Sequence, residues 1–72
     1  MISHPMPKKI RELIRDLKKA GFVDRGGKGS HRNFIHPSGK IMVISGNPAR
    51  DAKRYQEKQV AQKIDEVKNE NK

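Results

Sequence analysis

The residues best suited to chemistry lie together in residues 26–34, Gly-Gly-Lys-Gly-Ser-His-Arg-Asn-Phe. Histidine exchanges a proton near neutral pH more readily than other side chains, so His31 could act as a general acid or base. Lys28 and Arg32 place a positive charge on either side of it. Because glycine has no Cβ, the loop before His31 could bring backbone N–H groups close to an anion. This stretch therefore predicts acid–base chemistry on a phosphate group.

Each of these residues also has an ordinary structural interpretation. His31 could merely hydrogen-bond the loop at the start of a strand, and the residues alone leave that interpretation as open as catalysis. Lys28 and Arg32 could be solvated charges beside a turn instead of phosphate ligands. Ser30 could bind a phosphate or orient His31, although a serine in this position more often closes a turn.

Two other kinds of site are not indicated. Gly27-Lys28-Gly29-Ser30 superficially resembles a nucleotide-binding P-loop, but the pattern G-x-x-x-x-G-K-[ST] is absent. The three histidines lack i, i+4 spacing and have no carboxylate cluster beside them, so no metal site is expected. The chain has no cysteine, which excludes disulfides and zinc–thiolate sites. We expect no metal and no small-molecule cofactor.

The charge distribution points to an acidic partner. The chain has 72 residues and a net charge of +9. Residues 1–50 hold 11 Lys and Arg against 3 Asp and Glu, whereas residues 51–72 hold 6 against 5. Such a surface fits a nucleic acid or an acidic protein, although it could also serve only solubility. One Tyr, two Phe and no Trp leave few aromatic platforms for stacking single-stranded bases.

Nothing in the pattern of apolar residues predicts export or membrane insertion. The N-terminal segment lacks the continuous apolar stretch of a signal peptide. The longest apolar run, residues 41–44, is too short to span a bilayer. We therefore expect a cytoplasmic protein with no membrane partner.

The chain is expected to form one domain over residues 1–72. Residues 1–6 should be a loose leader, and Pro7 suits the first turn of a helix. Apolar residues then recur at helical spacing on one face: Ile10, Leu13, Ile14 and Leu17. Gly21 is suited to end this helix, and Phe22 can fold back onto its apolar face.

Three strands should follow, at residues 22–25, 31–36 and 40–45. The turn signal Pro37-Ser38-Gly39 predicts an antiparallel hairpin between the second and third. Side-chain alternation separates His31 from Phe34 and His36 in the second strand. We expect Phe34 in the core, His31 on the open face and Ile35 exposed, with His36 in a structural role.

A second helix should complete the domain. Asn47-Pro48 could begin it as cap and first residue, and Asp51 is an alternative cap. Its apolar stripe is imperfect and is expected to join the core, with the Tyr55 hydroxyl able to reach the surface: Tyr55, Val60, Ile64 and Val67. Residues 69–72 should fray. The order predicts an α+β fold, in which both helices pack on one face of a three-stranded antiparallel sheet.

Gly29-Ser30-His31, followed by Phe34 and His36-Pro37, resembles the HicA family of mRNA interferase toxins. The resemblance spans roughly residues 7–68 and includes the helix end at residues 13–22. It implies a double-stranded-RNA-binding-domain-like α-β-β-β-α fold and translation-independent cleavage of RNA. It also places the family's catalytic histidine at His31 and implies a HicB-type antitoxin that covers the site.

We therefore expect an RNA-cleaving toxin of a type II toxin–antitoxin system. His31 would be the metal-independent general acid–base, and four neighbours would bind the RNA phosphate: Lys28, Gly29, Ser30 and Arg32. One alternative is a non-catalytic RNA-binding module of the same fold, in which Lys28 or Arg32 matters more than His31. Another is an interaction module for an acidic protein.

Overall fold

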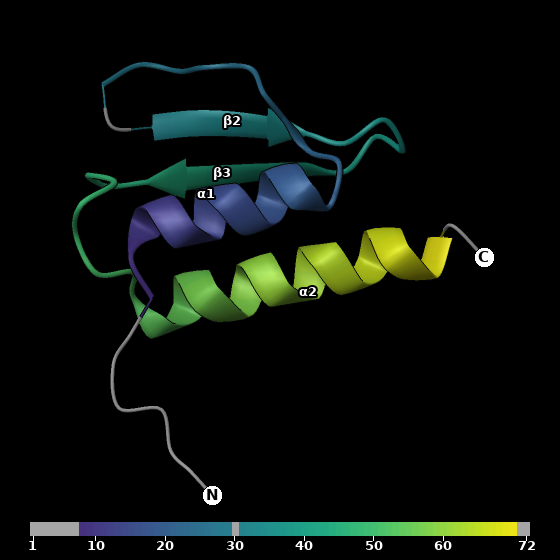
Figure 1. Cartoon of the computed structure of the whole chain (residues 1–72). Coiled ribbons are helices and arrows are strands. Elements are labelled where there is room, and N and C mark those ends of the chain that lie inside the picture. Colours follow the sequence, from purple (N-terminus) through teal and green to yellow (C-terminus); the bar gives the residue numbers. More distant parts are fainter. Residues whose placement is uncertain (1–7, 30, 71–72) are drawn as a thin grey trace, which may run out of the picture.

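The computed structural model describes residues 8–29 and 31–70 (Figure 1). The expectations for the leader at residues 1–6, for Pro7, for Ser30 and for residues 71–72 therefore lie outside the described residues. Two helices and three strands form in the predicted order: α1 (Ile10–Lys19), β1 (Val23–Asp24), β2 (His31–Ile35), β3 (Ile41–Ser45) and α2 (Arg54–Glu70).

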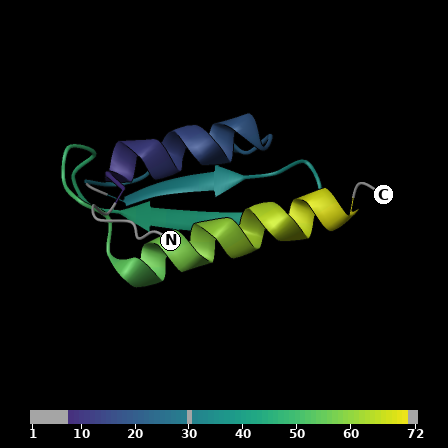
Figure 2. The ribbon, with the colours of Figure 1, turned by 60° about the horizontal axis from the view of Figure 1, so that its bottom comes forward.

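The three strands form one antiparallel sheet with the order β1-β2-β3. The register pairs Phe34 with Met42 and His31 with Ser45, which confirms the predicted hairpin. α1 contacts β1, while α2 contacts β3 and α1. Figure 2 shows both helices lying along the strands, α1 on the side of β2 and α2 on the side of β3. The predicted α+β fold is confirmed.

The core lies between the helices and one face of the sheet. Phe34 is fully buried, as predicted, and Phe22 folds back into the same cluster. The other core residues come from both helices, from β3 and from the loop before α2: Ile10, Leu13, Leu17, Met42, Ile44, Ala52, Val60 and Val67. Because strand side chains alternate, burial of Phe34 turns His31 to the uncovered face.

His36 belongs to the core and not to an exposed site. Its ring is buried, and the ring centroids of His36 and Phe22 are 5.2 Å apart. Its Nδ1 accepts a hydrogen bond from the backbone N–H of Ser38 at 3.0 Å and lies 2.9 Å from the Ser38 hydroxyl. The expected structural role of His36 is confirmed.

Asn47-Pro48 does not begin the second helix, contrary to the first of the two predictions. The Asn47 side chain instead accepts a hydrogen bond from the Ala49 N–H at 2.9 Å and forms a turn. Carbonyls of this turn cap α1, because the N–H groups of Ile10 and Arg11 donate to Arg50 and Pro48 at 2.9 and 3.0 Å. These bonds satisfy donors that a helix cannot satisfy itself.

Asp51 does not cap α2 either. Its carboxylate pairs with the Lys9 ammonium at 2.8 Å, so it joins the start of α1 to the loop. α2 begins at Arg54, and the N–H of the preceding Lys53 donates to Gln56 Oε1 at 2.8 Å. This is the reciprocal half of a capping box, in which a side chain three positions along the helix binds the cap residue.

The apolar stripe of α2 differs from the prediction at its first position. Tyr55 is 54 % exposed and does not join the core, whereas Gln56 is buried. The Gln56 amide is satisfied on both sides, because Nε2 donates to the Ser45 carbonyl at 2.9 Å and Oε1 accepts from Lys53. α2 also continues through Asn69 and Glu70, although residues 69–72 are predicted to fray.

Candidate functional site

The loop between β1 and β2 is hydrogen-bonded to β2 at Arg25, Gly26 and Lys28. Arg25 N–H donates to the Asn33 carbonyl at 2.7 Å, and Asn33 N–H donates to the Gly26 carbonyl at 2.8 Å. Arg25 and Gly26 thus both lie opposite Asn33, as in a β-bulge. The Asn33 side chain binds the same Gly26 carbonyl at 3.1 Å, and Gly26 N–H donates to Asp24 Oδ1 at 2.8 Å.

Two glycines are required by this geometry. A Cβ on Gly27 would collide with the carbonyl oxygen of His31, so only glycine lets the loop lie against the start of β2. Gly29 has φ +59°, in the left-handed region that side chains disfavour. The turn closes where His31 N–H donates to the Lys28 carbonyl at 3.0 Å. The glycines therefore fix the backbone position of His31.

His31 is the first residue of β2, and its side chain is exposed on the open face of the sheet, as predicted. Ser45 lies opposite it on β3. None of the residues that the structure describes hydrogen-bonds the His31 imidazole. The backbone of His31 holds the loop, which leaves the ring available to a ligand.

Lys28, Gly29 and His31 are brought together at the end of the sheet, but Arg32 is not. Alternation places Arg32 on the other face of β2, with Phe34. Its guanidinium pairs with Asp24 at 3.2 Å. Lys28 is exposed and has no ion pair with any described residue. Of the two cations that flank His31, Lys28 is therefore the one that pairs with no described acidic residue.

Sequence patterns did not single out Arg25, which also lies on the open face. It lines a shallow pocket with Val23 and Ile35, and its backbone pairs with Asn33, two residues from His31. A cation between a short strand and a glycine loop is a sequence feature that could have pointed to Arg25. Its position on the open face depends on the bulge, which forms only when the loop pairs with β2.

The open face also carries an apolar patch: Val23, Ile35, Ile41 and Val43. Their exposed fractions are 51, 37, 55 and 48 %. Val23 pairs with Ile35 and Ile35 pairs with Ile41, so three of them form a continuous row across the strands. Exposed contiguous apolar residues indicate an interaction surface. This patch shares its face with His31.

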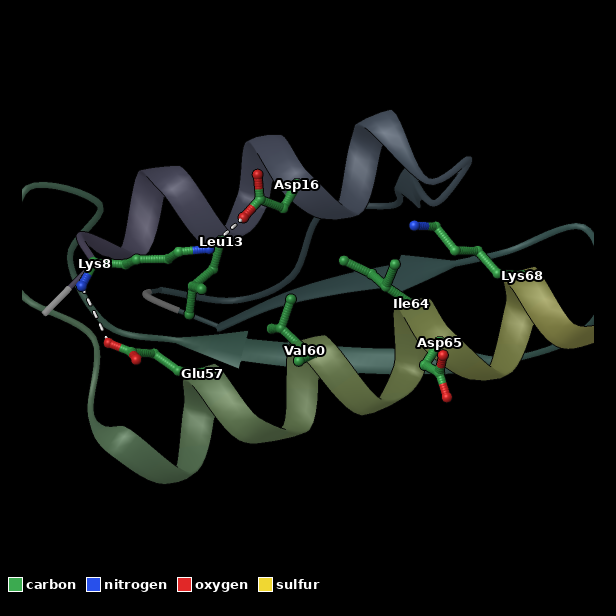
Figure 3. Close-up of a pocket in the computed structure, with 9 residues that line it drawn as sticks. Lys8, Leu13, Asp16, Glu57, Val60, Ile64, Asp65 and Lys68 are labelled. Atoms are coloured by element: carbon green, nitrogen blue, oxygen red, sulfur yellow. Dashed lines mark hydrogen bonds and ion pairs between the residues drawn. The ribbon is translucent and has the colours of Figure 1, made fainter. Parts of the chain in front are cut away.

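A groove of about 450 Å³ lies between α1 and α2, on the helical side (Figure 3). Leu13, Val60 and Ile64 form its apolar walls. Lys8 crosses its end, because the backbone N–H of Lys8 donates to Glu57 at 3.0 Å and its ammonium pairs with Asp16 at 3.1 Å. These contacts join the two helices, and the groove lies away from the face that carries His31.

Residues 8–29 and 31–70 offer neither a cluster of metal ligands nor a membrane-spanning helix. No group of three His, Asp or Glu side chains there could hold a metal ion. None of the described helices is long and apolar enough to cross a bilayer.

The comparisons with known proteins identify a family. The family model described as the HicA toxin of bacterial toxin–antitoxin systems matches residues 10–65. The match runs from the first residue of α1 into α2 and includes all three strands with His31. None of the curated proteins compared with the chain matches it.

Proposed function

The chain belongs to the HicA toxin family of bacterial toxin–antitoxin systems, and we propose that it is a cytoplasmic, metal-independent endoribonuclease of a type II system. Its substrate is mRNA, and His31 is the general acid–base. One observation carries this proposal: the His31 imidazole is exposed on the open face of the sheet, on backbone that a glycine loop holds in place.

The chemistry uses the RNA's own nucleophile. His31 removes the proton from a 2′-hydroxyl, and that oxygen attacks the adjacent phosphorus. The bond from phosphorus to the 5′-oxygen breaks, and the leaving oxygen takes a proton from the imidazolium. The products are a 2′,3′-cyclic phosphate and a 5′-hydroxyl. Positioned proton transfer contributes about 10²- to 10⁴-fold, so an enzyme with one histidine turns over slowly.

The phosphate is held by the loop before His31. Lys28 supplies positive charge as the negative charge on the phosphate oxygens grows, and Gly29 and Ser30 complete the cradle. Arg32 has a different role, because its pairing with Asp24 supports the loop from the other face.

The partner is a HicB-type antitoxin that covers the open face. The apolar patch of Val23, Ile35, Ile41 and Val43 supports this proposal, because RNA offers no matching apolar surface. A second copy of the chain would also carry a net charge of +9 and would be repelled. An antitoxin with carboxylates around an apolar centre fits both features, and it would exclude RNA from His31 by occupying the same face.

The test is RNA cleavage by the purified chain in EDTA, compared with His31→Ala and with Lys18→Ala as an exposed control on α1. We expect cleavage by the parent and the control but not by His31→Ala. Analysis of the ends should find 2′,3′-cyclic phosphates. Equal cleavage by His31→Ala would contradict the proposal, and 5′-phosphate products would indicate attack by water.

A non-catalytic RNA-binding module is the second candidate, favoured by the net charge of +9 and the confirmed fold. Double-stranded RNA is recognised by shape and phosphate contacts, which needs no aromatic platform. That function predicts RNA binding that weakens steeply with salt, and no cleavage by either the parent or His31→Ala.

A further inference from the structure

A second pocket lies at the same end of the sheet as His31, at the junction of β3 and α2. Its volume is about 290 Å³, and the residues that line it include Ser45, Asn47, Arg50, Lys53 and Tyr55. Neither the sequence pattern nor the proposed catalytic step accounts for it. It combines the chain's single tyrosine with two cations, although the sequence pattern places Tyr55 in the core.

Strand pairing connects this pocket to His31. Ser45 is the cross-strand partner of His31, and directly opposed residues of an antiparallel pair have Cα atoms about 4.5–5.5 Å apart. The Ser45 carbonyl accepts the hydrogen bond from Gln56, the residue after Tyr55. The first turn of α2 is therefore fixed to the end of β3, beside His31.

The backbone around the two cations is held in place without a ligand. Arg50 N–H donates to the Asn47 carbonyl, and the Arg50 carbonyl accepts from Ile10, both at 2.9 Å. Lys53 N–H donates to the Gln56 side chain at 2.8 Å. A pocket built from fixed backbone loses less conformational freedom when it binds a ligand.

The chemistry of the lining suits a nucleotide. Tyr55 is 54 % exposed and offers a ring on which a base can stack. Arg50 and Lys53 are exposed and form no ion pair with any described residue. Asp51, the one acidic residue that lines the pocket, has its charge balanced by Lys9 at 2.8 Å. The pocket therefore offers a stacking surface and net positive charge.

We propose that this pocket is a subsite for one nucleotide of single-stranded RNA, next to the phosphate at which His31 acts as general acid–base. Tyr55 stacks on the base, and Arg50 and Lys53 bind the neighbouring phosphate. This inference rests on the proposed ribonuclease function, since the nucleotide bound in the pocket adjoins the bond that is cleaved. It makes the substrate single-stranded at this position, because a base within a duplex has no free face.

Fluorescence tests the subsite directly, because the chain has one tyrosine and no tryptophan. The intrinsic fluorescence of the protein above the phenylalanine range therefore comes from Tyr55. Titration of His31→Ala with a single-stranded RNA oligonucleotide should quench it, with free tyrosine as the control for absorption by the RNA. The same sequence as a duplex should quench it much less. Unchanged emission at saturating single-stranded RNA would overturn the proposal.

Binding measurements identify the stacking. In the His31→Ala background, Tyr55→Ala should weaken single-stranded RNA binding by about 5- to 100-fold, while Tyr55→Phe retains the affinity of the background. Arg50→Gln and Lys53→Gln should each weaken it, whereas Lys18→Gln serves as a surface control. Equal affinity of the Ala and Phe variants would overturn the subsite. These readouts do not need cleavage, so they separate failure of the subsite from failure of the ribonuclease assignment.

In the cleaving chain, the subsite predicts a particular kinetic signature. Tyr55→Ala should raise KM by about the factor by which it weakens RNA binding. It should leave kcat close to that of the parent, because the ring does not touch the reacting atoms. Circular dichroism should confirm that the variant stays folded, as expected for an exposed side chain. An unchanged KM would contradict the proposal.

Discussion

Arg32 and Asp24 form an ion pair at 3.2 Å on the face of the sheet opposite His31. The second oxygen of the Asp24 carboxylate accepts the Gly26 N–H at 2.8 Å. Asp24 thus connects β2 to the glycine loop on the face opposite His31. Lys28 lies three residues before His31 and Arg32 directly after it. The two cations have different surroundings in the structure.

This difference predicts unequal effects on RNA binding. Lys28→Gln should reduce the dependence of log Kd on log salt by about one, as expected for one lost phosphate contact. Arg32→Gln should leave that slope unchanged, and the loss of a half-exposed pair should lower stability by less than about 1 kcal/mol. Salt titrations of RNA affinity measure both. Equal reductions in slope for the two variants would show that Arg32 also binds phosphate.

Gly27→Ala should impair catalysis through the backbone of His31. The added Cβ would collide with the His31 carbonyl, so the loop and the start of β2 must move apart. A displacement of about 1 Å in a catalytic group can lower the rate by about 10²-fold. The matched control is Gly39→Ala, where φ is +100° but no atom lies within 4 Å of the added Cβ.

Measuring both kcat/KM and Tm for the two glycine variants separates two effects. Tm reports the loss of stability from backbone strain, and kcat/KM reports displacement of the catalytic site. Gly39→Ala should lower Tm and leave cleavage by folded molecules unchanged, since its turn is at the other end of the hairpin. Gly27→Ala should lower both. Full activity of Gly27→Ala would mean that the loop does not position His31.

The fold followed from local patterns in the chain. The i, i+3, i+4, i+7 spacing of Ile10, Leu13, Ile14 and Leu17 specifies a helix with one apolar face, and the structure covers that face. Choosing Phe34 as the core residue decided the side of every residue in β2. β3 gave no such choice, because residues 41–44 are all apolar. Its exposed half was therefore not foreseen.

The details that could not be foreseen depend on contacts distant in sequence. Asn47-Pro48 has the composition of a helix start, but its turn supplies carbonyls to α1, almost 40 residues earlier in the chain. Gln56 replaces Tyr55 in the core only because the Ser45 carbonyl is there to accept its amide. Arg32 is turned from His31 by strand alternation, and its partner Asp24 belongs to another strand.

Substitution of the two described histidines should affect stability to very different extents. His36→Ala removes a buried ring that packs on Phe22 and accepts the Ser38 N–H, so it should lower the free energy of unfolding by about 2–4 kcal/mol. His31→Ala removes an exposed ring and should change it by less than about 0.5 kcal/mol. Urea unfolding measures both changes. A large loss of stability in His31→Ala would support a structural role for His31.

Substitution in the apolar patch should separate neutralisation from catalysis. Ile41 is 55 % exposed at the end of the hairpin opposite His31, so Ile41→Lys should leave RNA cleavage close to that of the parent. The same change would bury an unpaired charge under a bound antitoxin, and should weaken inhibition by at least about tenfold. Asn69→Lys, at an exposed position near the end of α2, adds the same charge outside the patch and serves as the control.

The measurement is the antitoxin concentration that halves RNA cleavage, with the purified cognate antitoxin as the inhibitor. Neutralisation of Ile41→Lys as complete as that of the parent would place the antitoxin elsewhere. In that case the groove between α1 and α2 becomes the better candidate, since it lies on the helical side and Leu13, Val60 and Ile64 contribute to its lining (Figure 3). An antitoxin bound there would have to act on His31 at a distance, whereas one bound over Ile41 blocks RNA directly.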